Sequence, residues 1–157
     1  MLGIYCPPIA NQIKPGQFIM LKVSDGTSPL LRRPFSVYKN YPANHPEKGK
    51  RGHLFILYKE VGKGTQKMTT LSKGQKVDLI GPLGNGFTLP PLPSSADCIL
   101  IGGGVGIVSL HLLAEALKAK KIVVLIGGKT QDDILGVKDF RKLNSNILIA
   151  TEDGSLG

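Results

Sequence analysis

The sequence predicts a β domain followed by an α/β domain. In the first half, short runs rich in β-branched and aromatic residues alternate with Gly, Pro, Asn and Asp, a spacing typical of a β-sandwich or barrel. In the second half, continuous apolar runs alternate with stretches of helical periodicity, which predicts parallel βαβ units. Between them lies LPPLPSS, Leu89–Ser95, whose prolines rule out regular structure, so we expect a linker there.

The first half contains four expected strands and one expected helix. Lys14–Val23 combines a Pro-Gly turn with a β-rich run, and Arg33–Tyr38 and His53–Lys59 are short apolar runs. Lys73–Phe87 repeats the arrangement, with a turn, an alternating strand and a Gly-rich corner. The helix is expected at Gly64–Gly74, because its larger residues recur at helical spacing and its last glycine is a stop signal.

The second half contains three expected strands separated by two expected helices. The strands are the apolar runs 97–104, 122–129 and 146–154. One helix is expected at 105–121, with lysines at the end where the helix dipole favours cations, and the other at 132–143. A parallel sheet is normally covered on both faces, and this half is short for that. We therefore expect a truncated product, or a chain whose remainder is supplied elsewhere.

The composition favours a folded and basic protein. Apolar residues make up 41% of the 157 residues, which is compatible with a packed core, and the net charge is +9. That charge suggests an anionic partner such as nucleic acid, an acidic protein or the phosphates of a cofactor. The basic residues are spread along the chain, with one cluster in the loop-like segment Lys39–Arg51, so a solvated surface is the simpler interpretation. Aromatic residues amount to only 6%, which argues against nucleic-acid binding by base stacking.

Membrane, secreted and metal-binding classes find no support in the sequence. No run of about 18 apolar residues exists, so no membrane span is expected, and the first residues lack the pattern of a signal peptide. Cys6 and Cys98 are far apart, which favours a reducing, cytoplasmic location and argues against a cluster site in this chain. His45, His53 and His111 lack ligand spacing, and we expect them in loops or in packing.

A glycine-rich motif, IGGGVG at Ile101–Gly106, stands where a strand gives way to a helix. Glycines there let the backbone approach a phosphate, although tight strand-to-helix packing also requires glycine. The context favours a nucleotide site. The motif departs from GxGxxG, and the nearest acidic residues that could bind a ribose, Asp132 and Asp133, lie beyond Lys129. A dehydrogenase of the usual Rossmann type therefore fits poorly.

The stretch LLRRPFSVY, Leu30–Tyr38, places fixed positive charge on an expected strand. Arg33 can offer a charged fork to a phosphate, Pro34 fixes the backbone, and Ser36 can donate a hydrogen bond to a polar ring edge. Taken alone, the stretch is more simply an edge strand protected by the charges of Arg32 and Arg33.

The sequence GKGT, Gly62–Thr65, changes that balance. It precedes the expected helix, so its N–H groups predict a second anion site with Thr65 as N-cap. The alternative is a simple turn and cap. The simpler turn interpretation would have to hold separately for two candidate anion sites in the β domain and a third in the α/β domain. Taken together, the three motifs therefore favour anion binding.

Taken in order, these motifs resemble those of the ferredoxin–NADP reductase superfamily, and within it most closely the electron-transfer subunits of NAD-dependent dihydroorotate dehydrogenases. The resemblance covers nearly the whole chain. It is carried by PGQF, RPFS, LYK, GT, GPLGNGF, IGGGVG and TEDGS, in that order.

The resemblance implies an antiparallel Greek-key β-barrel that binds FAD, residues 1–91, followed by a partial, Rossmann-like α/β domain with a parallel sheet that binds NAD(H), residues 95–157. It also implies contacts for individual residues. FAD would be contacted by Arg33, Pro34, Phe35 and Ser36, its flavin and ribityl chain by Leu57, Tyr58 and Lys59, and its diphosphate by Gly64 and Thr65. The nicotinamide nucleotide would lie over Gly102, Gly103, Gly104 and Gly106.

An electron-transfer role follows from the resemblance, in which hydride passes between nicotinamide and FAD. In the resembled complexes, electrons come from dihydroorotate through a catalytic subunit with FMN and a [2Fe–2S] cluster, as part of pyrimidine biosynthesis. The four cysteines that hold this cluster in the family are absent here, so this chain cannot bind it, and Ile107, Val108 and Ser109 stand where the family usually has prolines. No side chain is expected to act as acid, base or nucleophile.

Two other interpretations stay open. One is a reductase subunit of another complex in the superfamily, of the sulfide dehydrogenase or hydrogenase type. The other is a non-catalytic module whose basic barrel binds an acidic protein or RNA.

Overall fold

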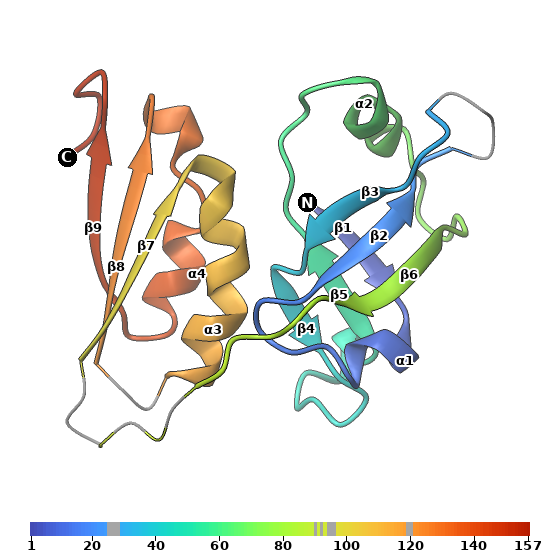
Figure 1. The fold of residues 1–157 in the computed structure, drawn as a ribbon, viewed down its shortest axis with the longest axis horizontal. Coiled ribbons are helices and arrows are strands. Elements are labelled where there is room, and N and C mark those ends of the chain that lie inside the picture. Colours follow the sequence, from blue (N-terminus) through green and yellow to red (C-terminus); the bar gives the residue numbers. More distant parts are fainter. Residues whose placement is uncertain (25–28, 90, 92, 94–96, 119–120) are drawn as a thin grey trace.

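The computed structural model describes residues 1–24, 29–89, 91, 93, 97–118 and 121–157. Its strands and helices form a β half and an α/β half that lie side by side (Figure 1). The expected linker Leu89–Ser95 falls partly outside the described residues, and its described positions, Leu89, Pro91 and Pro93, belong to no helix or strand. Because the linker is only partly described, the domain boundaries 1–91 and 95–157 stay a prediction.

Among the described residues, no helix has the length and apolar character of a membrane span.

The β half contains two antiparallel sheets of three strands each. Their orders are β1-β5-β4 and β3-β2-β6. Side chains of both sheets form one core, to which Ile19, Leu21, Leu54 and Ile56 contribute with almost no exposure. The expected antiparallel strands are thus confirmed, but the described residues form two sheets and not one closed barrel. The strands are β1 Leu2–Tyr5, β2 Phe18–Lys22, β3 Arg33–Ser36, β4 Lys39–Tyr41, β5 His53–Ile56 and β6 Asp78–Leu83.

The helices of the β half are short. They are α1 Pro7–Ala10, the 3-10 helix η1 Lys48–Lys50 and α2 Lys63–Thr69. Helix α2 ends earlier than the expected range 64–74. The hydroxyl groups of Thr69 and Thr70 donate to carbonyls three residues back, which competes with continued helix.

The α/β half contains a parallel sheet of order β7-β8-β9, as expected from the apolar runs. The expected helix 105–121 is wrong in type and length, because a 3-10 helix precedes a short α-helix and Lys121 already belongs to a strand. The expected helix 132–143 is interrupted at Gly136, whose φ of +76° is left-handed. The elements are β7 Asp97–Gly103, η2 Gly104–Leu110, α3 His111–Ala116, β8 Lys121–Gly128, η3 Gln131–Asp133, α4 Val137–Arg141 and β9 Asn146–Thr151.

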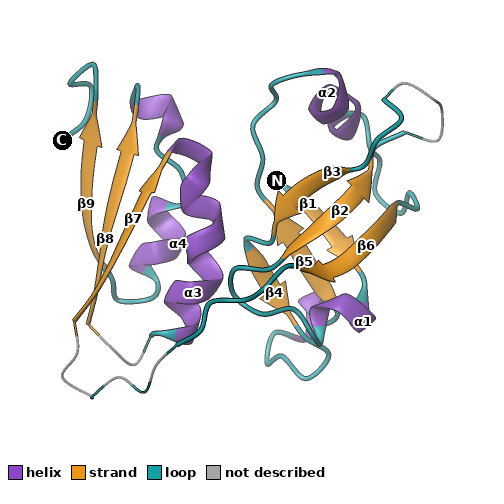
Figure 2. Ribbon diagram, viewed as in Figure 1, coloured by secondary structure: helices purple, strands orange, loops and turns teal. Residues whose placement is uncertain are grey.

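Helices α3 and α4 both lie on the face of this sheet that is turned toward the β half (Figure 2). The hydrophobic core on that face includes Val124, Ile126 and Phe140, which are almost fully buried. On the opposite face Ile99 and Ile101 are 63% and 70% exposed. Within the described residues the sheet is therefore covered on one side only, consistent with the shortness noted from the sequence.

Candidate dinucleotide site

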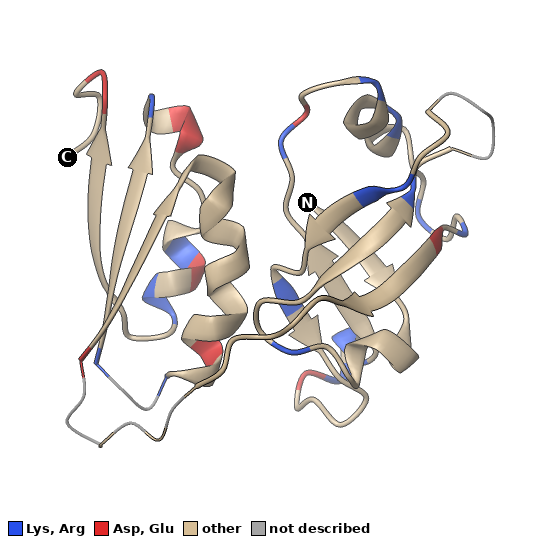
Figure 3. Cartoon of the chain, in the orientation of Figure 1, with Lys and Arg blue, Asp and Glu red and all other residues tan. Residues whose placement is uncertain are grey.

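Strand β3 brings Arg33 beside the turn that opens α2. A Cβ built on Gly64 would lie 3.5 Å from Nε of Arg33, so the arginine packs directly on this glycine. The two segments that the sequence singled out as anion sites are thus neighbours on one surface. Most Lys and Arg residues lie in the β half, whereas acidic residues gather in the α/β half (Figure 3).

The two adjacent arginines have different partners. Arg32 forms an ion pair with Asp78 and also donates to the carbonyl of Asp78 at 3.0 Å. Arg33 donates to the carbonyl of Leu31 at 2.7 Å and contacts no carboxylate among the described residues. Strand β3 is an edge strand, and Arg32 directly precedes it with its guanidinium held by Asp78 of β6. Arg33 lines a cavity together with the turn Gly62–Thr65, so an anion in that cavity would meet its positive charge.

Thr65 is not the N-cap of α2, contrary to the sequence-based expectation. The N-cap is Gly62, and Thr65 occupies the third helical position. Its hydroxyl accepts from the N–H groups of Val61, at 2.9 Å, and Gly62, at 3.2 Å, and donates to the carbonyl of Gly62. The side chain thereby fixes the shape of the loop.

Two adjoining cavities bring together the residues expected to contact FAD. They share Pro34, Phe35, Val61 and Thr65 in their walls. One, of about 380 Å³, is lined by Pro29, Arg33, Pro34, Phe35, Val61, Gly62, Lys63, Gly64 and Thr65. The other, of about 360 Å³, is lined by Pro34, Phe35, Ser36, Leu57, Tyr58, Lys59, Val61, Thr65, Val105, Gly106, Val108 and Ser109.

The second of these cavities is formed by both halves of the molecule. Phe35 and Tyr58 meet edge to face there, with ring centroids 6.1 Å apart. Val105 and Ser109 approach from the α/β half. Their contribution was missed in the sequence, because η2 was expected to be part of a regular helix.

A third cavity, of about 700 Å³, lies at the carboxyl ends of the parallel strands. Gly103 and Gly104 line it together with Gly127, Gly128 and Thr151. Ligands of open α/β sheets bind at this edge. Gly102 does not line the cavity. A Cβ there would lie 2.9 Å from Cα of Ile107, so Gly102 permits tight packing of β7 on η2.

Lys59 and Asp133 form an ion pair across the two halves at this third cavity, with Nζ and Oδ1 2.7 Å apart. The hydrogen bond from Lys59 lowers the pKa of Asp133 below its ordinary value. Asp133, which was considered as a ribose ligand, is thus engaged with Lys59, and Lys129 also lines this cavity.

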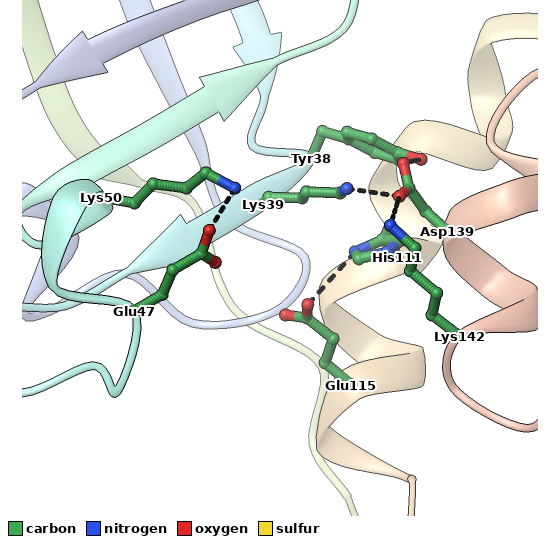
Figure 4. A network of polar contacts seen from close by, with 8 residues as sticks. All are labelled: Tyr38, Lys39, Glu47, Lys50, His111, Glu115, Asp139 and Lys142. Atoms are coloured by element: carbon green, nitrogen blue, oxygen red, sulfur yellow. Dashed lines mark hydrogen bonds and ion pairs between the residues drawn. The ribbon is translucent and has the colours of Figure 1, made fainter.

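A partly buried polar network joins the two halves (Figure 4). Tyr38 donates to Oδ2 of Asp139 at 2.9 Å, and Nζ of Lys39 lies 2.6 Å from Oδ1. His111 is 2% exposed and packs on the rings of Tyr38 and Phe140. Burial, followed by the nearby Lys39, lowers the pKa of His111 to about 4, so the ring is neutral at pH 7. It is a packing residue, as expected.

No metal site accompanies these cavities in the part of the chain that the structure describes. No group of three or more His, Cys, Asp or Glu side chains there is placed to hold a metal ion.

The fold is of the ferredoxin–NADP reductase type. An NADH-dependent reduced ferredoxin-NADP oxidoreductase, solved for its flavin-based electron bifurcation, matches with a TM-score of 0.78 and 28% identity, covering 99% of this chain and 52% of that chain. The ferredoxin reductase in carbazole 1,9a-dioxygenase matches with a TM-score of 0.69 and 22% identity, covering 95% and 45%. No protein-family model matches the chain.

The chain is homologous to the electron-transfer subunits of dihydroorotate dehydrogenase B (NAD(+)), which confirms the resemblance seen in the sequence. It is 36% identical to the subunit of Geobacillus thermodenitrificans over 151 residues, covering 95% of this chain and 56% of the relative. It is 37% identical to the subunit of Desulforamulus reducens over 153 residues, covering 96% and 55%. The chain thus spans about half the length of the curated relatives it matches.

Proposed function

We propose that the chain binds FAD across the two adjoining cavities and NAD(H) in the third, and that it passes electrons between them. The observation that carries this proposal is the gathering of every residue expected to contact FAD along two cavities with shared walls. Each cavity falls within the range of about 300–1,000 Å³ typical of ligand sites. The homology to electron-transfer subunits supports the same function.

The residues present suit a dinucleotide diphosphate. Arg33 lies against Gly64 and carries a charge that no described carboxylate compensates, so it can pair with a phosphate. The absence of a Cβ at Gly64 lets the Arg33 side chain pack directly on the turn, and Gly64 itself is buried. The hydroxyl of Thr65 is already engaged by the N–H groups of Val61 and Gly62, so Thr65 would contact a ligand through its backbone.

The flavin supplies the redox chemistry when bound, and the protein positions it. Tyr58 and Phe35 provide an apolar wall, and Ser36 offers a hydroxyl at the same cavity. Val105 and Gly106 bring the α/β half to that wall, and Lys59 lines both this cavity and the one at the carboxyl ends of the parallel strands. No acid or base is required of this chain.

The homologous subunits suggest the wider setting. We propose a cytoplasmic complex in which a catalytic dihydroorotate dehydrogenase subunit with FMN exchanges electrons with this FAD through a [2Fe–2S] cluster, in pyrimidine biosynthesis. The chain has only two cysteines, so the cluster would have to be held by other polypeptide.

A flavin spectrum of the purified protein tests the proposal. We expect a yellow protein that releases FAD on denaturation. A colourless protein that binds RNA with steep dependence on salt would instead support the non-catalytic basic module.

Arg33→Ala tests the site, with Arg32→Ala as its matched control. Loss of a charge-assisted hydrogen bond should weaken FAD binding by about 10- to 100-fold in the first variant. The second removes a charge that Asp78 already compensates and should keep its flavin. Full flavin retention in Arg33→Ala, or in the charge reversal Arg33→Glu, would overturn the assignment.

A further inference from the structure

The ion pair between Lys59 and Asp133 bridges the two halves where two cavities adjoin. Nζ of Lys59, in the loop that follows β5, lies 2.7 Å from Oδ1 of Asp133, the last residue of η3. Lys59 lines the third cavity and also the cavity that Phe35 and Tyr58 line, and no other described residue lines both. Asp133 lines the third cavity. A ligand in the third cavity would therefore meet this pair.

The two partners of the pair differ in how firmly they are held. The side chain of Asp133 is 17% exposed, and hydrogen bonds from Lys59 and from the backbone of Thr130 and Lys129 lower the pKa of its carboxyl. The side chain of Lys59 is 62% exposed and contacts no second carboxylate among the described residues. An exposed lysine on a flexible stem gains little from such a pair. Lys59 is therefore the partner that a competing anion can draw away.

The charges at the third cavity give an anion a reason to compete for Lys59. Lys129 also lines this cavity and forms no ion pair among the described residues, whereas Asp133 and the exposed Glu152 are the carboxylates there. A phosphate would be attracted to both lysines and repelled by Asp133. In the ligand-free protein, Asp133 thus neutralises one of the two lysines that a phosphate would use.

We propose that the pair of Lys59 and Asp133 is a latch between the halves, which the diphosphate of a nicotinamide dinucleotide opens by drawing Lys59 away from Asp133. This inference rests on the proposed function, because it takes NAD(H) as the ligand of the third cavity. Without ligand, the latch ties η3 to the loop that follows β5. With ligand, Lys59 binds phosphate and the tie is lost. Asp133 and the ligand compete for one lysine.

Competition predicts that the two partners change ligand affinity in opposite directions. Asp133→Asn releases Lys59 and should tighten the binding of NAD⁺ by about two- to fivefold, as expected from the strength of an exposed ion pair. Lys59→Gln removes the group that the phosphate takes over and should weaken binding by about tenfold. Asp132→Asn is the matched control, because it removes the same charge from the neighbouring exposed position without releasing Lys59.

Calorimetric titration with NAD⁺, which cannot reduce a bound flavin, measures these affinities. A double-mutant cycle then reads the latch without any activity assay. The melting temperatures of the wild type, Asp133→Asn, Lys59→Gln and the double variant give the coupling between the two side chains. We expect a coupling of about 1–3 °C without ligand and none at an NAD⁺ concentration that saturates all four proteins.

A fixed strut between the halves would give different results. Weaker NAD⁺ binding in both Asp133→Asn and Lys59→Gln would overturn the latch, and so would equal tightening in Asp133→Asn and Asp132→Asn. A coupling that persists at saturating NAD⁺, or that is absent without ligand, would also overturn it. A wild type that does not bind NAD⁺ at all would overturn the proposed function together with the latch.

Discussion

Replacing Asp139 with asparagine should weaken the junction between the two halves with little change in shape. The Asp139 carboxylate accepts from the buried hydroxyl of Tyr38 and pairs with Lys39, and Lys142 lies 3.9 Å away. In the Asp139→Asn variant, the amide oxygen can still accept the hydrogen bond from Tyr38 without a change of position, but the negative charge is lost. The variant therefore removes the negative charge, and it also replaces the oxygen that faces Lys39 with an amide nitrogen, which cannot accept from the ammonium group.

The size of the expected loss of stability follows from the burial of Lys39 and Asp139. The side chains of Lys39 and Asp139 are 17% and 24% exposed, so solvent screens the pair only partly. A hydrogen bond to a charged group contributes about 1.5–3 kcal/mol, and Asp139→Asn removes the charge from two such contacts. We expect the free energy of unfolding at pH 7 to fall by about 2–3 kcal/mol.

The effect should depend on pH in a defined direction. Burial alone would raise the pKa of Asp139, but the hydrogen bonds from Lys39 and Tyr38 outweigh it and hold the pKa below its ordinary value. A lowered pKa in the folded protein means that the carboxylate stabilises the fold above the unfolded pKa of about 3.9, and that this contribution is lost as pH falls through the folded value.

Urea unfolding of the wild type and Asp139→Asn between pH 7 and pH 3 measures the difference in free energy of unfolding and its dependence on pH. The exposed Asp132→Asn is the matched control, and we expect it to change stability by less than about 0.5 kcal/mol. Equal stability of Asp139→Asn and wild type at pH 7, or a gap that stays constant down to pH 3, would refute the reasoning.

Two further predictions concern the same junction. Gly136 has φ +76°, and a Cβ there would lie 2.9 Å from the hydroxyl oxygen of Tyr38, whereas Gly154 has φ +69° and open space. Gly136→Ala should therefore lower the melting temperature more than Gly154→Ala, which costs only about 1 kcal/mol of backbone strain. Burial raises the pKa of Glu115 from 4.5 to about 7, so its ionisation disfavours the fold as pH rises through that interval. Glu115→Gln should match wild type at pH 4 and be more stable at pH 8 by up to about 1 kcal/mol, since the side chain is partly exposed; a gap largest at pH 4 would contradict this.

Local pattern was enough to predict most strands, but it missed β4, which lies in the segment Lys39–Arg51 that was expected to be a loop, and it missed the type of helix beside the glycine motif. The apolar runs that became β7, β8 and β9 are continuous, which marks strands of a parallel sheet. The range 105–121 has helical periodicity, yet Gly104, with φ +49°, and Gly106 stand at its start and a 3-10 helix forms there. Periodicity reports which face is buried and not which helix type forms.

The residues that line the candidate cavities could be predicted where they share a strand or a turn, and not where the halves meet. The motifs RPFS and GKGT each indicate a candidate anion site within a few consecutive residues. Tyr38 and Asp139 are 101 positions apart, and Lys59 and Asp133 are 74 apart, with no local signal that pairs them. Only the folded chain brings such residues together.

The bare face of the parallel sheet has a practical consequence for handling the protein. Ile99, Ile101 and Leu148 form a patch of branched aliphatic groups in contact with water. Such a patch promotes self-association, and kosmotropic salts such as sulfates strengthen the hydrophobic attraction. Concentrated stocks should therefore cloud on addition of ammonium sulfate, and Ile101→Lys should keep them clear while leaving the packed face untouched.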